Sequence, residues 1–224
     1  MAESIRLLAR IRGHGGVERD NADVLNGALA AFLDFGIKRT SMAEVARRGG
    51  LSLATLYRRF GGKTDVVQAV GLWQVRHLLE QADASMRRQA DEGASAEDQI
   101  VELFVAFALG LRDNPLLDRL LATDAATVLP YLTTGGAPVI ELGRDFLAEF
   151  ITRLQEAGKL PAYDPLPVAE LVARTALSLV LTRPTVIPLD DEAAARRFAR
   201  DHIAPGFRPL DVRTTTQATG AAPR

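Results

Sequence analysis

Apolar residues recur every three or four positions along nearly the whole chain, and this spacing constrains the fold more than any other feature of the sequence. It is the spacing of helices that bury one face, and the breaks between such stretches contain Gly, Pro, Ser or Asn. Residues 178–187 are β-branched enough for a strand, but no neighbouring segment would pair with them. The predicted helices cover residues 19–35, 42–48, 53–60, 63–91, 96–112, 115–121, 125–131, 138–157, 167–181 and 190–200. We therefore predict an all-α fold.

The residue types exclude several classes of protein. Hydrophobic residues make up 47% of the 224 residues, enough for a globular core. There is no Cys and there are only three scattered His, so we expect no metal site, no thiol nucleophile and no disulfide. No nucleophile–base pair or phosphate loop is evident, so we expect no catalytic residues, no cofactor and no enzyme activity. No apolar run approaches the ~20 residues of a membrane span, and no signal peptide is evident, so a cytoplasmic protein without a membrane partner is expected.

Charge is distributed unevenly along the chain. The net formal charge is −1, which by itself argues against a nucleic-acid partner. Up to Lys63, however, eleven Lys and Arg stand against six Asp and Glu, a net charge of +5, and the rest of the chain carries −6. A basic amino-terminal part joined to an acidic remainder suggests that only the first part faces a polyanion, although chance clustering would give the same pattern.

Three predicted helices near the amino terminus are separated by short breaks with recognisable start and stop residues. Gly36 can end the first helix in the left-handed conformation. Ser41 and Glu44 match a capping box, in which each side chain satisfies the backbone N–H of the other at the start of the second helix. Ser52 would cap the third helix after a Gly-Gly-Leu turn. This arrangement is typical of a helix-turn-helix unit, whose last helix enters the major groove of DNA.

The third of these helices, residues 53–60, has one face to bury and another to present to DNA. At roughly 100° per residue, Leu56 and Phe60 fall together and are expected in the core. Ala54 and Arg58 then point away, where a methyl group can contact a thymine methyl and a guanidinium can donate to guanine.

The flanks and the amino-terminal end of the same helix carry groups suited to phosphate. Thr55 and Tyr57 can donate hydrogen bonds to phosphate oxygens. Ser52, Leu53 and the free N–H groups of the first turn lie at the end that would enter the groove.

Residues 40–63 resemble the amino-terminal signature of TetR-family transcriptional regulators, and the likeness is close from about residue 22 to residue 70. The matching positions are Thr40, Ser41, Val45, Ala46, Gly50, Leu51, Ser52, Thr55, Tyr57, Phe60 and Lys63. The resemblance implies a homodimer that binds a (pseudo)palindromic double-stranded DNA operator with the helix of residues 53–60 in the major groove. It also implies that Thr40, Tyr57 and Lys63 contact the phosphate backbone, with Ser41 at the start of the same motif.

The carboxy-terminal part reads as a helical bundle for dimerisation and ligand binding. Residues 138–157 and 167–181 are apolar on more than one side, so two such helices per subunit could form a four-helix dimer interface. A small-molecule effector would lie between the long helix of residues 63–91 and its neighbours. The candidate pocket residues are Trp73, His77, Phe104, Phe107, Tyr131, Phe146, Thr175 and Ser178. Each could instead be ordinary core, and for His77 a satisfied core histidine is the leading alternative.

Residues 114–124 and 129–136 resemble the effector domain of the QsdR-type branch of the family, which is associated with control of lactone breakdown. This likeness implies an apolar, lactone-like effector. The predicted organisation is a flexible basic arm (1–18), a helix-turn-helix DNA-binding domain (19–63), an effector-binding and dimerisation domain (64–205) and a disordered tail (206–224). The arm could reach the minor groove or be a frayed terminus.

The sequence thus predicts a ligand-responsive transcriptional repressor that a small apolar effector releases from its operator. Activation instead of repression is left open by the sequence. A second hypothesis is a helical small-molecule carrier or interaction module with a vestigial helix-turn-helix.

Overall fold

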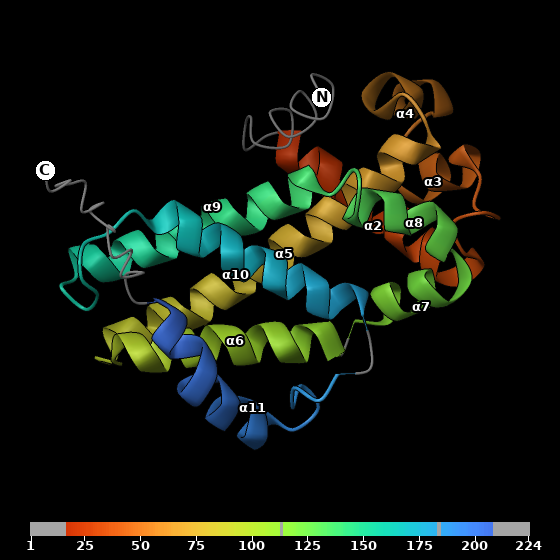
Figure 1. The fold of residues 1–224 in the computed structure, drawn as a ribbon. Helices are drawn as coiled ribbons and strands as arrows, with labels where there is room; N and C mark the ends of the chain where they lie inside the picture. The colour runs from red at the N-terminus through yellow and green to blue at the C-terminus, as the bar shows by residue number, and fades with distance from the viewer. Residues whose placement is uncertain (1–16, 113, 183–184, 208–224) are drawn as a thin grey trace, which may run out of the picture.

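The computed structural model describes residues 17–112, 114–182 and 185–207, and all regular secondary structure in these residues is helical (Figure 1). The prediction of an all-α fold is confirmed. In chain order the elements are α2 (Val17–Phe35), α3 (Met42–Arg48), α4 (Leu53–Phe60), α5 (Lys63–Asp91), α6 (Ala96–Arg112), α7 (Pro115–Thr123), α8 (Ala125–Leu132), α9 (Ala137–Glu156), α10 (Pro165–Leu181), α11 (Glu192–Phe198), the π-helical η1 (Ala199–Ile203) and the 3₁₀ η2 (Ala204–Phe207). Within the described residues, no helix is both long and apolar enough to cross a membrane.

The small amino-terminal domain consists of α2, α3, α4 and the first turns of α5. Its core includes Leu56 of α4, fully buried, and Val66 and Val70 of α5. Helices α2 and α3 approach closely, because a Cβ atom on Gly27 would lie 2.7 Å from the backbone carbonyl carbon of Arg48. This close contact packs the end of α3 directly against α2.

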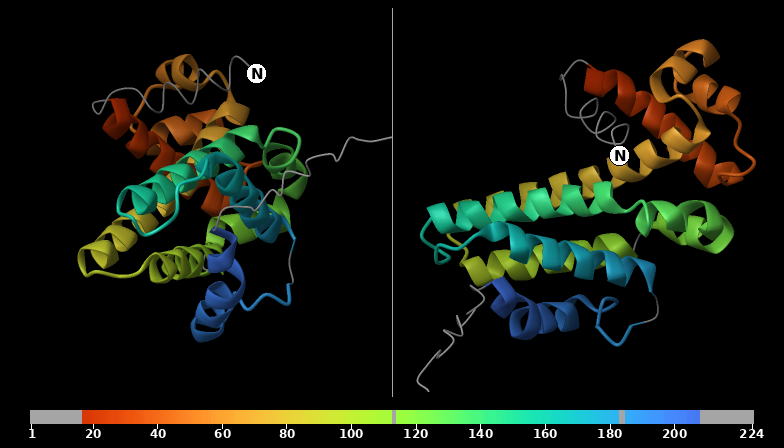
Figure 2. Two further views of the ribbon diagram at one scale, coloured as in Figure 1. Left: turned by 60° about the vertical axis from the view of Figure 1, so that its left-hand side comes forward. Right: turned by 45° about the horizontal axis from the view of Figure 1, so that its top comes forward.

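The larger domain is a bundle of α5, α6, α9 and α10, with α9 and α10 packed side by side along most of their length (Figure 2). Helix α11 and η1 cover α6 from the outside. The stretch 178–187 that could have formed a strand continues α10 up to Leu181. Helix α10 begins at Pro165, two residues before the predicted start, because the Asp164 side chain caps it by accepting from Leu166 N–H.

The carboxy-terminal end of the chain differs from the prediction. Phe207, expected in a disordered tail from residue 206, is 1% exposed and packs edge-to-face against Phe150 at 6.4 Å between ring centroids. The Tyr163 hydroxyl donates to the carbonyl oxygen of Phe207 at 2.5 Å, and burial raises the pKa of that phenol. The predicted helix of residues 190–200 ends at Phe198, and η1 and η2 carry the chain to this anchor. Residues 17 and 18 of the expected flexible arm form the start of α2. The rest of that arm, residues 1–16, and the tail from residue 208 lie outside the described residues.

The two domains meet where the α7–α8 junction lies against the end of α2. Asp124, between α7 and α8, is only 3% exposed, and its Oδ2 accepts from Ile37 N–H at 3.3 Å. Nearby, Arg119 Nη2 donates to the carbonyl oxygen of Asp34 at 3.2 Å. The amino-terminal domain is therefore held to the bundle by α7 and α8 as well as by α5, which runs through both.

Candidate nucleic-acid interface and internal cavity

Helix α4 forms where the capping residues of the sequence predict it. The Ser52 side chain accepts from Thr55 N–H at 3.1 Å, which satisfies one of the free donors of the first turn. At the other end, Gly61 has a φ of 74° and its N–H donates to the carbonyl oxygen of Tyr57. The left-handed φ at Gly61 stops the helix and lets α5 start two residues later.

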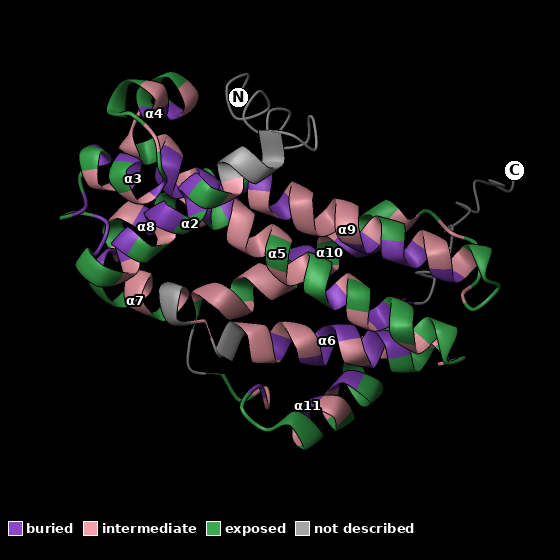
Figure 3. Ribbon diagram, turned by 180° about the vertical axis from the view of Figure 1, so that it is seen from behind, coloured by how far each residue is buried: buried purple, intermediate pink, exposed green. Residues whose placement is uncertain are grey.

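The two faces of α4 differ as expected. Leu56 is fully buried and Phe60 is 8% exposed, so both anchor the helix in the core. Ala54 and Arg58 are exposed on the opposite side, and Tyr57 is 47% exposed. In Figure 3, α4 lies at one end of the molecule, and most of its residues are coloured as exposed or intermediate. The helix thus exposes a methyl, a phenol and a guanidinium group to solvent, while its buried face packs in the core of the amino-terminal domain.

The amino-terminal end of α4 carries a pair of hydroxyls. Ser52 Oγ and Thr55 Oγ1 lie 2.9 Å apart, so one donates to the other. Leu53, beside them, is 42% exposed, a large apolar side chain at the tip of the helix. This end combines polar oxygens with one apolar side chain for close contact.

Thr40 lies in the interior, unlike the phosphate contact that the resemblance implies. The residue is 2% exposed, and its hydroxyl lies 2.8 Å from the carbonyl oxygen of Gly36 and 3.1 Å from that of Ala31. It therefore ties the α2–α3 turn to the end of α2. The adjacent Ser41 is exposed, caps α3 by accepting from Glu44 N–H, and is the hydroxyl of this pair that faces solvent.

Lys63 lies at the start of α5, and its position is set by the neighbouring turn. Its Nζ donates to the carbonyl oxygen of Lys38 at 3.0 Å, in an exposed environment. The ammonium group therefore spans from α5 to the turn before α3. Lys38 and Arg39 in that turn are also exposed cations. They are not among the predicted DNA-binding residues, because nothing but their charge distinguishes them in the sequence from other surface residues.

An ion-pair network stabilises α3 behind this surface. Glu44 Oε1 lies 2.7 Å from Arg47 Nη2 and 2.6 Å from Arg48 Nε, and Arg48 Nη1 reaches Asp34 at 2.6 Å. The hydrogen bonds from the two arginines lower the pKa of Glu44 from 4.5 to about 2, and the bond from Arg47 makes the largest contribution. The expected Ser41 half of the capping box is present, and the Glu44 carboxylate lies against the two arginines.

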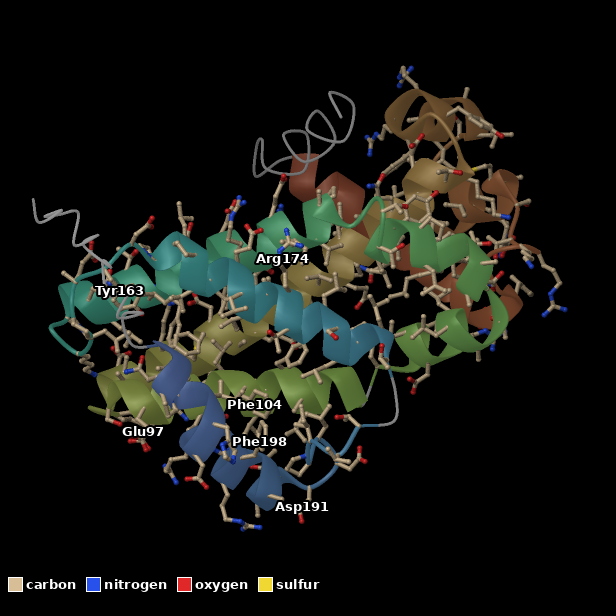
Figure 4. The ribbon with its side chains drawn as sticks, viewed as in Figure 1. Glu97, Phe104, Tyr163, Arg174, Asp191 and Phe198 are labelled. Carbon is tan, nitrogen blue, oxygen red and sulfur yellow. The ribbon has the colours of Figure 1, made fainter. Side chains whose placement is uncertain are left out.

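A cavity of about 600 Å³ lies inside the larger domain, between α5, α6, α9 and α10, with α7 and α8 at one end and η1 and η2 at the other. Phe104 of α6 and Phe198 of α11 are on its wall, with ring centroids 5.8 Å apart (Figure 4). Phe32 and Ile37 of the amino-terminal domain also reach it. The cavity is therefore in direct contact with the helix-turn-helix domain.

The structure brings five of the eight candidate pocket residues to this cavity. They are Phe104, Phe107, Tyr131, Phe146 and Thr175. Trp73 and His77 lie off its walls and stack on each other, with ring centroids 5.9 Å apart. The His77 side chain is 56% exposed, which also rules out the core-histidine alternative. Ser178 lines a second hollow between α9 and α10, beside Arg174.

None of the α5 residues that line the cavity is among the predicted pocket residues. Residues 67, 68, 71, 74, 75 and 78 line the cavity, a stripe one residue round the helix from the one that carries Trp73 and His77. The sequence pattern that could have shown this wall is the i, i+4, i+7, i+11 spacing of Val67, Gly71, Gln74 and Leu78. Because this stripe contains a Gly and a Gln, it is less apolar than the stripe that carries Trp73 and His77.

Comparison with known proteins agrees with this architecture. Residues 24–70 match the family model for bacterial regulatory proteins of the tetR family. An uncharacterised HTH-type transcriptional regulator of Mycobacterium bovis is 26% identical over 182 residues, which cover 80% of this chain and 91% of that protein. A counterpart from Mycobacterium tuberculosis matches equally well.

Solved structures share the fold over most of the chain. The TetR-family repressor AlkX from Dietzia sp., implicated in biodegradation of n-alkanes, superposes with a TM-score of 0.64 at 22% identity, covering 83% of this chain and 93% of that one. The transcriptional repressor QsdR of R. erythropolis gives 0.61 at 18% identity, covering 85% and 95%. At these identities the likeness shows the fold.

Proposed function

By its amino-terminal domain the chain belongs to the TetR family of DNA-binding transcriptional regulators, and from this we propose that it is a homodimeric, ligand-responsive repressor. One observation carries the proposal: α4 is anchored by Leu56 and Phe60 and exposes Ala54, Tyr57 and Arg58 at the end of the molecule. A rigid helix with such a face suits the major groove.

The proposed contacts divide into two kinds. Arg58 and Ala54 read base edges, with Ser52, Leu53 and Thr55 at the end of α4 that enters the groove. Tyr57, Ser41 and Lys63 bind phosphates, and the hydrogen bond from Lys63 to the Lys38 carbonyl supports an ammonium that is already positioned. Thr40 acts through the backbone turn that it holds.

Dimerisation is proposed to use α9 and α10. Leu166 and Leu171 of α10 are 49% and 59% exposed, a large apolar area for one helix of a lone subunit. Pairing α9 and α10 with their copies would bury these side chains and give the twofold axis that a palindromic operator requires.

The cavity is the proposed effector site, and the effector is a small apolar molecule, a lactone among the candidates. It would act in the cytoplasm by favouring a spacing of the two α4 helices that does not fit the operator. Repression is supported by two proteins of the same fold, AlkX and QsdR, which are both repressors. A ligand shifts the operator equilibrium only by its preference for one spacing over the other.

Selection of operator sequences from random DNA tests the proposal, followed by binding assays on the selected duplex with light scattering of the complex. We expect a palindromic site bound by a dimer. The cavity by itself would also suit a small-molecule carrier. That function would be favoured if the protein bound no duplex at low salt, or if light scattering showed that it binds the selected duplex as a monomer.

A further inference from the structure

The walls of the internal cavity carry no formal charge among the residues that the structure describes. Although 25% of the chain is Asp, Glu, Lys or Arg, none of these residue types lines the cavity. A charged ligand would therefore lose its hydration shell with no carboxylate, ammonium or guanidinium group on the walls to replace it, which is costly in an apolar interior; the one imidazole on the described walls is His202.

The polar side chains on the walls are few and dispersed over five elements. They are Gln68, Gln74, Asn114, Tyr131, Thr175 and His202. Asn114 Oδ1 already accepts from Leu117 N–H, and the Thr175 hydroxyl donates to the Leu171 carbonyl oxygen. Such scattered groups can satisfy one neutral polar end, but they do not form the cluster of donors that a carboxylate or phosphate needs.

The cavity is long. Its α5 wall extends from Val67 to Leu79, a rise of about 18 Å along the helix axis. An extended chain can lie along this length, between walls that are made mostly of hydrocarbon side chains.

Gly71 lies on the α5 wall, nearer to Val67 than to Leu79, and widens the cavity there. It is flanked on the same helical face by Val67, Gln74 and Val75, which all line the cavity. A Cβ atom on Gly71 would meet no atom within 4 Å. The absence of a side chain at Gly71 thus leaves free space at this part of the cavity wall.

We propose that the ligand of this cavity is an uncharged, extended molecule made mostly of hydrocarbon, that is, an alkyl or acyl chain with a neutral end group. The proposal rests on the proposed function, since it names the chemistry of the effector. A long-chain alcohol and an acyl lactone share this chemistry, and the experiment separates them.

Calorimetric titration of the full chain at pH 8 tests the proposal with four probes of one chain length. The probes are decanol, N-decanoyl homoserine lactone, decanoate and decyltrimethylammonium. We expect one or both of the uncharged probes to bind, and both charged probes to bind at least about tenfold more weakly because their charge must be desolvated. Decanol should bind more tightly than octanol by about fourfold for each added methylene.

Two substitutions at Gly71 locate the site. Gly71→Leu places a large side chain in the cavity and should weaken binding of the tighter uncharged probe by about tenfold or more. Gly71→Ala is the matched control, because it makes a similar change in helix propensity and adds only one methyl. Neither variant should unfold more easily than the parent, since both replace Gly inside a helix.

The proposal is overturned if decanoate binds as tightly as the better uncharged probe, if no probe binds, or if Gly71→Leu binds like Gly71→Ala. Operator binding without any ligand is measured separately. If the protein does not bind an operator but binds the uncharged probes as expected, the proposed regulatory function is wrong and the proposed ligand chemistry is still supported.

Discussion

The backbone N–H of Ile37 donates to Oδ2 of Asp124 at 3.3 Å, across 87 positions of sequence. Ile37 follows the end of α2, and its side chain lines the cavity. Asp124 joins α7 and α8, which also line it through Leu120 and Val128. One buried hydrogen bond therefore connects the cavity wall to the turn that precedes α3.

Replacing Asp124 should destabilise the protein. In Asp124→Ala the Ile37 N–H stays buried without its acceptor, and we expect the free energy of unfolding to fall by about 1–3 kcal/mol. Asp124→Asn keeps an oxygen at the same place and should lose less. Urea unfolding monitored by circular dichroism measures both, and equal losses would show that the hydrogen bond to Ile37 is not the cause.

Arg58→Ala should weaken binding to the selected operator by about 1–3 kcal/mol if Arg58 reads guanine, and should have less effect on unrelated duplexes. Fluorescence anisotropy with both DNA types measures the difference. Arg87→Ala is the matched control, because Arg87 is an exposed arginine of α5 paired with Asp83, away from α4. A uniform loss on both DNA types would indicate a phosphate contact.

Lys63→Ala should weaken binding to all duplexes equally, because an ammonium group that binds phosphate carries no sequence information. The slope of log affinity against log salt concentration should fall by about 1 for each phosphate that the ammonium no longer neutralises. Lys63→Arg keeps the charge and should retain most of the slope. An unchanged slope in Lys63→Ala would contradict the phosphate role.

Leu171→Glu should convert the dimer to a monomer, since a charge would enter the proposed α9–α10 interface. Leu171 is 59% exposed in one subunit, so the subunit itself should stay helical. Leu129→Glu, at another exposed leucine, on α8, is the control and should remain dimeric. Light scattering distinguishes these outcomes, and a dimeric Leu171→Glu would move the interface elsewhere.

The Glu44 network should make stability depend on acid. Because its pKa is lowered from 4.5 to about 2 in the folded protein, the charged form stabilises α3 above pH 4.5, and this contribution is lost as pH falls toward 2. Glu44→Gln lacks it at every pH. The stability difference between the parent and Glu44→Gln should therefore be constant near neutral pH and shrink below pH 4.5, as measured by urea unfolding. A constant difference down to pH 2 would contradict the lowered pKa.

Much of the interface could be predicted because α4 depends on local sequence. Ser52 and Gly61 determine where the helix begins and ends, and Leu56 and Phe60 share a face through helical geometry alone. The burial of Thr40 could not be predicted in this way, since its hydroxyl bonds to carbonyls of the preceding helix and turn.

The cavity shows the same division. Phe104 and Phe107 were found because aromatic residues at helical spacing are conspicuous, whereas Gly71 has no side chain to reveal its role. Trp73 and His77 were placed in the pocket because they share the Val66–Val70 face of α5. That face is buried only along its first turns, and at His77 it turns to solvent.

The sequence by itself determined which segments are helical, the ends of α3, α4, α5 and α6, and the two faces of α4, because helix formation and capping depend on residues within a few positions of each other. The tertiary structure decided which stripe of α5 lines the cavity, that Phe207 closes the bundle, and that Asp124 bonds Ile37. These depend on how the helices rotate and pack against partners distant in sequence, and no local pattern records that choice.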